Sequence, residues 1–271
     1  MHKRLFCSTG CLIGRQNNCD WRLIPHYARA IDVSGFEFMM LGEYYGHFDE
    51  IARTLSGSGL AFPVLHCDKL IGNLLCERKD EDTAEALRRF DSNCTLARKI
   101  GARRVVLHLW GGFISDSSAE YNIDKFQNII EIAAKYGVTP LVENIPCTTR
   151  DPLCHWDEIS AKYPGTQFIF DTRFGGLHRQ NGRFAFGGRA VDGSVTHMHI
   201  SDFLGLPLEY KAMRPILHPG EGVVDFELLF GALRGRYTGT VTLESPVLYD
   251  GGIDIAKLNR TLHYIEDKLL N

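Results

Sequence analysis

The stretch FIFDTR, at residues 168–173, runs from an apolar segment directly into the carboxylate of Asp171. Burial of an unpaired carboxylate is costly, so a strand this apolar should not end on an aspartate that has no partner. One such ending has little meaning by itself. The partner of Asp171 is therefore sought at the ends of the other strands.

Short apolar runs with the length and composition of β-strands recur along the whole chain. They are LFCST at 5–9, FEFMM at 36–40, FPVLH at 62–66, RVVLHLW at 104–110, TPLVEN at 139–144, QFIFDT at 167–172, VTHMHIS at 195–201 and GTVTLES at 239–245. Longer amphipathic segments with helical spacing separate several of them, at 82–102, 122–137, 225–235 and 253–270. The first two of these end near Gly101 and on Gly137, and a glycine is typical just past a helix C-terminus.

The alternation of strands and helices favours parallel strands joined by right-handed crossovers. Eight such units in 271 residues predict a (β/α)₈ barrel that forms a single domain over residues 1–271. An open doubly wound sheet is the rival fold, but residues 8–16, STGCLIGRQ, lack its GxGxxG phosphate loop. Two long irregular loops are expected, at 174–194 and 203–222.

Composition narrows the class of partner. The formal net charge is −3, so no global basic field attracts nucleic acid or anionic lipid. No apolar run approaches the length of a membrane span, and the first residues, MHKRLFCSTGCLIG, do not read as a secretory signal. The eight cysteines are scattered and form no CxxC pair, which predicts reduced thiols in a cytoplasmic protein. Neither a nucleic acid nor a membrane is expected as a partner.

Six of the predicted strands carry a carboxylate or an imidazole at or near their C-terminal end. The residues are Glu143, Asp171 and Glu244, His66 and His108, and the pair His197 and His199. In a (β/α)₈ barrel the C-terminal ends of the strands form the face that holds the active site. The sequence therefore delivers a set of acidic and imidazole groups to one rim.

Alternation along a strand gives an independent check, because neighbouring side chains point to opposite faces. His197 and His199 share one face of their strand, and Thr240, Thr242 and Glu244 share one face of theirs. The apolar residues between them take the other face. We expect the polar set to face the barrel interior and the apolar set to face the surrounding helices.

A structural role is the alternative for each of these residues taken alone. A terminal aspartate is often a helix N-cap, and a buried histidine such as His197 is often a hydrogen-bonded core residue. Carboxylates packed together repel one another, however, and a divalent cation removes that problem. Three carboxylates and one imidazole suit Mn²⁺, Mg²⁺, Co²⁺ or Zn²⁺. One divalent metal ion is therefore the expected partner of Asp171.

The ordered set LVENIP, FIFDTR, HMHISD and HPGEGVVDFELL, followed by GTVTLE, resembles the xylose isomerase-like TIM-barrel family. The likeness covers essentially the whole chain in element order. That family includes sugar and inosose isomerases, ketose 3-epimerases, inosose dehydratases and endonuclease IV. The resemblance implies that Glu143, Asp171, His199 and Glu244 hold one metal ion.

The endonuclease IV branch carries three zinc ions, and His66 and His108 match two of its ligands. Phe174 occupies the position where that branch has a further histidine, and the stretch MRPILHPGEG lacks its Asp-x-His. The balanced charge also argues against a DNA-binding groove. The isomerase and epimerase branch is therefore favoured.

Residues of the loops and strand ends are candidates for substrate binding. RPILHPGEG resembles the loop that closes over substrate in the isomerase branch, where Arg214 or His218 would bind a hydroxyl or phosphate group. His178 is a candidate of the same kind, and His66 and His108 would orient substrate. Trp110, with Phe6 and Phe113, would form an apolar wall for a sugar face, although a solvated loop and core packing are the alternatives.

The predicted chemistry is proton transfer beside a carbonyl group of a sugar, sugar phosphate or inosose, through a metal-stabilised enediolate. Glu143 and Glu244 come from distant strands and would act as base and acid on opposite faces of the substrate. This predicts a metal-dependent sugar isomerase or epimerase. An inosose dehydratase-type lyase, an endonuclease IV-like zinc nuclease and a catalytically silent sugar-binding barrel stay open, as does assembly into a homo-oligomer.

Overall fold

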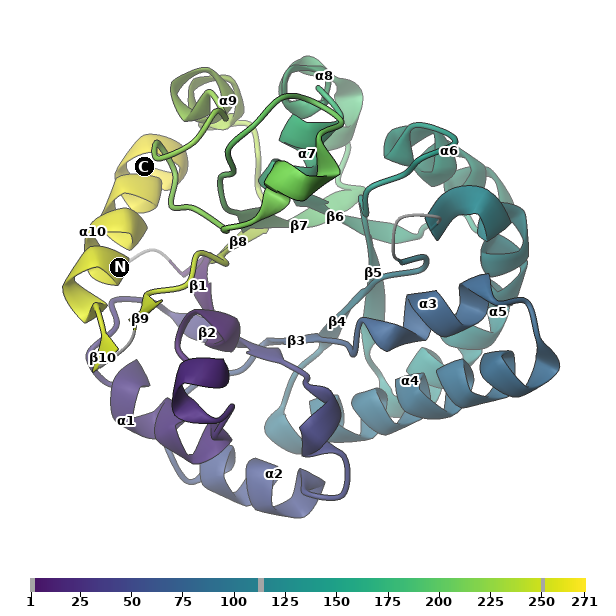
Figure 1. Ribbon diagram of the computed structural model, residues 1–271, viewed down its shortest axis with the longest axis horizontal. Coiled ribbons are helices and arrows are strands. Elements are labelled where there is room, and N and C mark those ends of the chain that lie inside the picture. Colours follow the sequence, from purple (N-terminus) through teal and green to yellow (C-terminus); the bar gives the residue numbers. More distant parts are fainter. Residues whose placement is uncertain (1–2, 112–114, 250–251) are drawn as a thin grey trace. The chain divides into compact units, whose positions relative to one another are not determined.

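The computed structural model describes residues 3–111, 115–249 and 252–271. Its eight parallel strands close into a barrel in the order β1 to β8 (Figure 1). The strands are β1 Leu5–Ser8, β2 Gly35–Met39, β3 Val64–His66, β4 Arg104–Leu107, β5 Thr139–Glu143, β6 Gln167–Asp171, β7 Val195–Ile200 and β8 Thr240–Leu243. The predicted (β/α)₈ barrel is confirmed, and each predicted strand overlaps an observed one, although β4 ends at Leu107, before His108 and Trp110 of the predicted strand.

Helices follow the strands along the chain. They are α1 Ile24–Ala28, α2 Phe48–Ser56, α3 Leu70–Cys76, α4 Asp80–Ile100, α5 Ala119–Tyr136, α6 Pro152–Lys162, α7 Thr172–Leu177, α8 Asn181–Phe186, α9 Phe226–Leu233 and α10 Ile255–Ile265. A π-helical turn, Glu266–Leu270, extends α10, and a short antiparallel pair, β9 Leu248–Tyr249 and β10 Gly252–Ile253, precedes it. None of the described helices is long and apolar enough to cross a membrane.

Two of the predicted helix ends show why the sequence is informative at these points. Helix α4 has acidic residues in its first turn and basic residues in its last, which suits the helix dipole. It ends on Gly101, whose φ of 85° is left-handed, and α5 ends in the same way on Gly137, with φ 64°. Glycine adopts this conformation without steric cost, so both predicted C-caps are confirmed.

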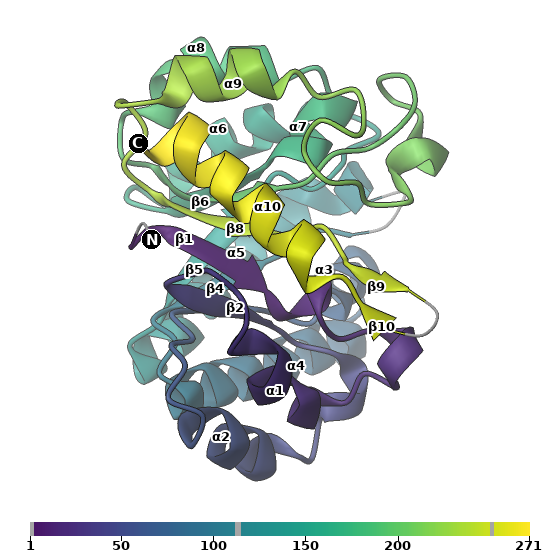
Figure 2. The ribbon, with the colours of Figure 1, turned by 90° about the vertical axis from the view of Figure 1, so that its left-hand side faces the viewer.

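The chain divides into two compact units. The first comprises Met1–Phe38, Arg53–Ala61 and Phe170–Asn271, and the second comprises Met39–Ala52 and Phe62–Ile169. In the first unit β1 pairs with both β2 and β8, and β7 pairs with β8. Helices α8 and α9 pack against each other in the same unit (Figure 2).

The second unit contains the pairs β3–β4, β4–β5 and β5–β6. Helices α3, α4 and α5 contact one another beside these strands (Figure 1). The registers place the C-terminal ends of neighbouring strands at the same level: His66 pairs with Val106, and Glu143 pairs with Ile169. The polar residues that end these strands are therefore held by the sheet itself.

The predicted alternation of faces is confirmed in β7 and β8. Met198, Ile200, Val241 and Leu243 are fully buried, as expected of the face that meets the helices. His197 and Thr242, from the other face, hydrogen bond to each other at 2.9 Å. This alternation separates an apolar layer from an internal polar one.

One predicted loop is wrong. Residues 174–194 contain helices α7 and α8 and a 3₁₀ turn, Gly188–Ala190. The many glycines of this stretch favoured an irregular loop, but Phe174, Leu177 and Phe184 are buried and supply apolar contacts for the helices. The second predicted loop, 203–222, is largely irregular and contains one 3₁₀ turn, Tyr210–Met213.

Candidate metal centre

A buried network of carboxylate, imidazole and hydroxyl groups occupies the first unit. Glu37, from β2, lies between the imidazoles of His197 and His199, and its two oxygens are each 2.9 Å from one Nε2 atom. The Thr242 hydroxyl donates to the Glu37 carboxylate at 3.1 Å, and Thr240 lies beside His197 Nδ1. Glu37 and both histidines are fully buried.

The electrostatics of this network favour an ionised glutamate. Burial by itself would raise the pKa of Glu37, because it disfavours the charged form. The charge interaction with His199 and the hydrogen bonds from both imidazoles outweigh burial and hold the pKa of this carboxyl well below its ordinary value. His197 is buried and hydrogen bonded within this network, which matches the core role that the sequence analysis gave as one alternative for it.

His199 also faces Glu244, which directly follows β8. Its Nδ1 atom is 3.5 Å from an oxygen of the Glu244 carboxylate. Two donor atoms that each lie about 2.1 Å from one cation are about 3.0 Å apart at an octahedral angle and about 3.4 Å at a tetrahedral one. The spacing of these two groups and their chemical types thus fit ligands of one divalent ion.

Asp171 ends β6 and begins α7. One of its oxygens, Oδ1, accepts a hydrogen bond from the Phe174 backbone N–H at 2.8 Å, which caps the helix. The other oxygen, Oδ2, is 3.9 Å from the guanidinium of Arg173, and Asp171 is fully buried. Asp171 therefore has the helix-capping role that the sequence analysis gave as its alternative, and Oδ1 is the oxygen that caps the helix.

The second unit contains its own cluster at the strand ends. His108 Nε2 is 2.6 Å from an oxygen of Glu143, and His66 Nε2 is 3.8 Å from the same oxygen. All three side chains are buried, and their donor atoms are close enough to hold a metal ion. His66 Nδ1 lies 2.9 Å from the Cys67 carbonyl, which can only accept, so this nitrogen carries a proton.

The remaining predicted residues divide between core and surface. Trp110 is fully buried, donates its indole N–H to the Ile145 carbonyl at 3.2 Å and contacts the ring of His155. His178 is half-buried with its ring centroid 6.4 Å from that of Tyr210, and Arg214 is exposed. Of the proposed apolar wall, Phe6 lies with its ring centroid 6.2 Å from that of His197, and Phe113 lies outside the described residues.

His218 is buried and bonded through both ring nitrogens. Nδ1 is 2.8 Å from the Thr261 hydroxyl, and Nε2 is 3.3 Å from the Pro246 carbonyl. Burial and the nearby ammonium group of Lys257 lower the pKa of this imidazole. These contacts join the loop before α9 to α10 and account for the residue without a substrate.

Glu37 is the residue of this network that the sequence reasoning did not single out. Glu37 lies inside the segment FEFMM and not at the C-terminal end of the strand, whereas the predicted site residues were taken from strand ends. The available signal was a single carboxylate flanked on both sides by phenylalanine in a strand that is otherwise apolar. By the argument applied to Asp171, such a carboxylate also requires a partner.

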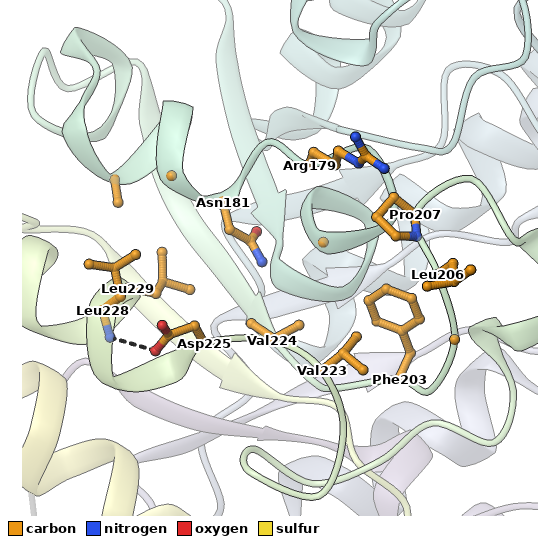
Figure 3. Close-up of a pocket in the computed structure, with 14 residues that line it drawn as sticks. Arg179, Asn181, Phe203, Leu206, Pro207, Val223, Val224, Asp225, Leu228 and Leu229 are labelled. Atoms are coloured by element: carbon orange, nitrogen blue, oxygen red, sulfur yellow. Dashed lines mark hydrogen bonds between the residues drawn. The ribbon is translucent and has the colours of Figure 1, made fainter.

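The first unit also contains an apolar pocket of ≈ 400 Å³ (Figure 3). It lies among α7, α8, α9 and the segment after β7, and its walls include Phe203, Leu206, Val224 and Leu229. Asp225 at its edge caps α9 by accepting from the Leu228 backbone N–H (Figure 3). No residue of the predicted site lines this pocket.

Several solved structures share this fold. The 3-keto-D-glucoside 4-epimerase YcjR from E. coli aligns with a TM-score of 0.71 at 16% identity, over 97% of this chain and 99% of that one. An IolI protein with a bound zinc atom aligns with a TM-score of 0.72 at 14% identity, over 98% and 99%. D-allulose 3-epimerase from Methylomonas sp., in complex with D-allulose, aligns with a TM-score of 0.70 at 16% identity, over 98% and 96%.

Among proteins with curated descriptions, none matches this sequence. A family model described as xylose isomerase-like TIM barrel matches residues 25–260, which is most of the chain. This match and the closed order of the strands agree with the resemblance seen in the sequence motifs. The chain belongs to the xylose isomerase-like TIM-barrel family.

Proposed function

We propose that this protein is a divalent-metal-dependent isomerase or epimerase of sugars or related polyols. The observation that carries the proposal is the buried His199–Glu244 pair at the ends of β7 and β8, whose donor atoms are 3.5 Å apart. Structures of the same fold include two sugar epimerases and a zinc-bound IolI protein, which supports this chemistry. A soluble sugar or polyol is thus the proposed partner.

Four residues are proposed to hold one metal ion: Glu143, Asp171, His199 and Glu244. Each ends a barrel strand or lies within one residue of its end, and these ends form the functional face of a (β/α)₈ barrel. Their donor set of carboxylates and one imidazole suits Mn²⁺, Mg²⁺, Co²⁺ or Zn²⁺. When bound, the cation would supply Lewis-acid polarisation of the carbonyl and hydroxyl oxygens of the substrate.

The chain's own residues would move the proton. Glu143 and Glu244 are the proposed base and acid, because each carboxylate can accept a proton from a substrate carbon and return one. Glu143 lies against His108 and His66, and these imidazoles would orient the substrate oxygens beside it. His178 and the exposed Arg214 are proposed to contact the distal part of the substrate, whereas Trp110 and His218 are accounted for by their core contacts.

Metal depletion followed by reconstitution tests this function. The purified protein would be stripped with a chelator, loaded separately with each of the four ions, and assayed on a panel of aldoses, ketoses, sugar phosphates and inososes. Turnover that disappears on stripping and returns with one of the ions supports the proposal. A protein that binds metal and converts no member of the panel would favour the silent sugar-binding barrel, and loss of water from an inosose would favour the lyase.

A zinc nuclease is the second candidate, and one observation favours it. His66 and His108, which are not among the four proposed ligands, lie with Glu143 in a group that could hold a metal ion, and a protein with several zinc ions requires such additional ligands. Against it, Phe174 stands where that branch has a histidine ligand, and this phenylalanine is buried. Cleavage of abasic DNA together with three zinc ions per chain would establish the nuclease and exclude the isomerase.

A further inference from the structure

Glu37 makes contacts that suit a support for a metal ligand better than a ligand itself. Oε1 accepts from His199, and Oε2 accepts from both His197 and Thr242. A metal bound to either oxygen would have to compete with these buried donors, and a buried donor left without its acceptor is unfavourable. The carboxylate is thus committed to the imidazoles.

The contacts of His199 define which of its ring nitrogens faces the proposed metal site. Glu37 Oε1 lies 2.9 Å from Nε2, so the hydrogen bond to this carboxylate engages Nε2. The other nitrogen, Nδ1, lies 3.5 Å from the Glu244 carboxylate. The ring is therefore held with Nδ1 toward Glu244.

The second imidazole completes the arrangement. His197 Nε2 lies 2.9 Å from both the Glu37 carboxylate and the Thr242 hydroxyl, and its Nδ1 lies beside the Thr240 hydroxyl. Thr242 also donates to Glu37 Oε2. The carboxylate is therefore held from two sides, by His199 at Oε1 and by His197 and Thr242 at Oε2.

We infer that Glu37 is a positioning residue that holds the His199 ring through Nε2 and makes Nδ1 its metal-binding atom. The inference rests on the proposed function, because it assigns a ligand atom of the same metal site. Metal-bound histidines commonly donate their other N–H to a carboxylate, and loss of that partner typically lowers metal affinity about 10–100-fold. His197, although adjacent on the same strand face, acts on the carboxylate and is not a ligand.

Glu37→Gln tests the inference with little change of shape. The amide oxygen can accept from one imidazole only, its NH₂ group faces the other, and the negative charge is lost. Asp116→Asn is the matched control, because Asp116 is also a buried carboxylate beside an imidazole, 3.3 Å from His155, but lies outside the proposed site. Both variants and the wild type would be titrated with Co²⁺ at a temperature where all are folded.

The expected result is cobalt binding that is about 10–100-fold weaker in Glu37→Gln and unchanged in Asp116→Asn. Equal cobalt affinity in Glu37→Gln and wild type would overturn the inference and leave the proposed function standing. Wild-type protein that binds no cobalt would overturn both. Equal losses in the two variants would show a general effect of stability and would also overturn the inference.

A spectroscopic measurement on the wild type does not depend on any variant folding. Long-range ¹H–¹⁵N correlation spectra of histidine-labelled protein distinguish a protonated ring nitrogen from one with a lone pair. Nε2 of His199 should carry a proton in the metal-free protein and keep it after Zn²⁺ is added, and Nδ1 should be the nitrogen whose signal changes on addition of Zn²⁺. Loss of the Nε2 proton, or a zinc response at Nε2, would contradict the assigned role of Glu37.

Discussion

At the scale of single residues, the chemistry of a carboxylate depends on what its oxygens already contact. Glu37 is bonded to two imidazoles and a hydroxyl, Asp171 caps a helix through Oδ1, and Glu244 faces Nδ1 of His199. Three acidic side chains of one unit therefore have three different roles. Only the last two are proposed to contact a metal ion.

The first prediction separates proton transfer from metal binding. Glu143→Gln and Glu244→Gln each keep the side-chain shape and one oxygen but remove the basic carboxylate. Exchange of the substrate's carbon-bound proton with solvent should fall about 10²–10⁴-fold in both, which is the usual contribution of a general acid or base. The measurement is deuterium incorporation from D₂O at saturating metal, with any sugar that the wild type converts.

Asp171→Asn is the control for this prediction, because Asp171 is proposed to bind metal and to move no proton. Its exchange should be slow at low metal concentration and recover largely in excess metal. Exchange at the wild-type rate in both glutamate variants would show that these residues are ligands only.

At the scale of secondary-structure elements, helix ends and loop anchors carry the local stability. Asp116 anchors the loop after β5: its carboxylate accepts from the backbone N–H groups of Thr148, Thr149 and Arg150. His155, in α6, lies 3.3 Å from the same carboxylate. One buried acid thus holds the entry of α6 in place.

The second prediction concerns acid denaturation. Burial by itself would raise the pKa of Asp116. Hydrogen bonds from the Thr149 hydroxyl and from three backbone N–H groups outweigh burial, so the pKa of this carboxyl lies below its ordinary value. A group of this kind stabilises the fold above its unfolded pKa of about 3.9 and loses this effect as the pH falls toward its folded pKa. Below about pH 4, the free energy of unfolding should therefore fall more steeply for the wild type than for Asp116→Asn.

Asp124→Asn is the control for the acid effect, since Asp124 is exposed and its carboxylate forms a surface ion pair with Lys162. Urea unfolding between neutral and acid pH would measure all three proteins. Parallel pH curves for the wild type and Asp116→Asn would refute the anchoring role of Asp116.

The third prediction tests the helix ends recognised in the sequence. Gly137 has φ 64° with open space around the position of an added Cβ, so alanine there meets no neighbour and suffers only from the left-handed backbone. Gly137→Ala should lower the free energy of unfolding by about 1–2 kcal/mol. Gly231 lies inside α9, also with open space, and Gly231→Ala should raise it by about 0.5–1 kcal/mol.

Thermal or urea unfolding would measure the change in the free energy of unfolding for each of the two glycine variants. Opposite signs are the expected outcome, because the two glycines differ in backbone conformation and not in crowding. A stabilising effect of Gly137→Ala would contradict the assignment of this residue as a left-handed C-cap.

At the scale of the whole molecule, the fold was predictable because the strands are apolar, short and regularly spaced. Alternation within β7 and β8 also predicted which side chains form the internal polar layer. The helices after β6 were missed, since Gly175 and Gly176 favour a loop while the packing of Phe174 and Leu177, which stabilises α7, is a tertiary effect. Glu37 was missed for a similar reason: its imidazole partners lie 160 and 162 residues away in sequence.

The central claim is that one divalent cation is bound by Glu143, Asp171, His199 and Glu244, and anomalous diffraction from crystals grown with Mn²⁺ tests it most directly. The account predicts one manganese peak per chain, with donor atoms of all four residues about 2.0–2.6 Å away. A fully occupied cluster of three ions that includes His66 and His108 would contradict it in favour of the nuclease. A peak located away from these residues, or no peak at saturating Mn²⁺, would contradict the claim outright.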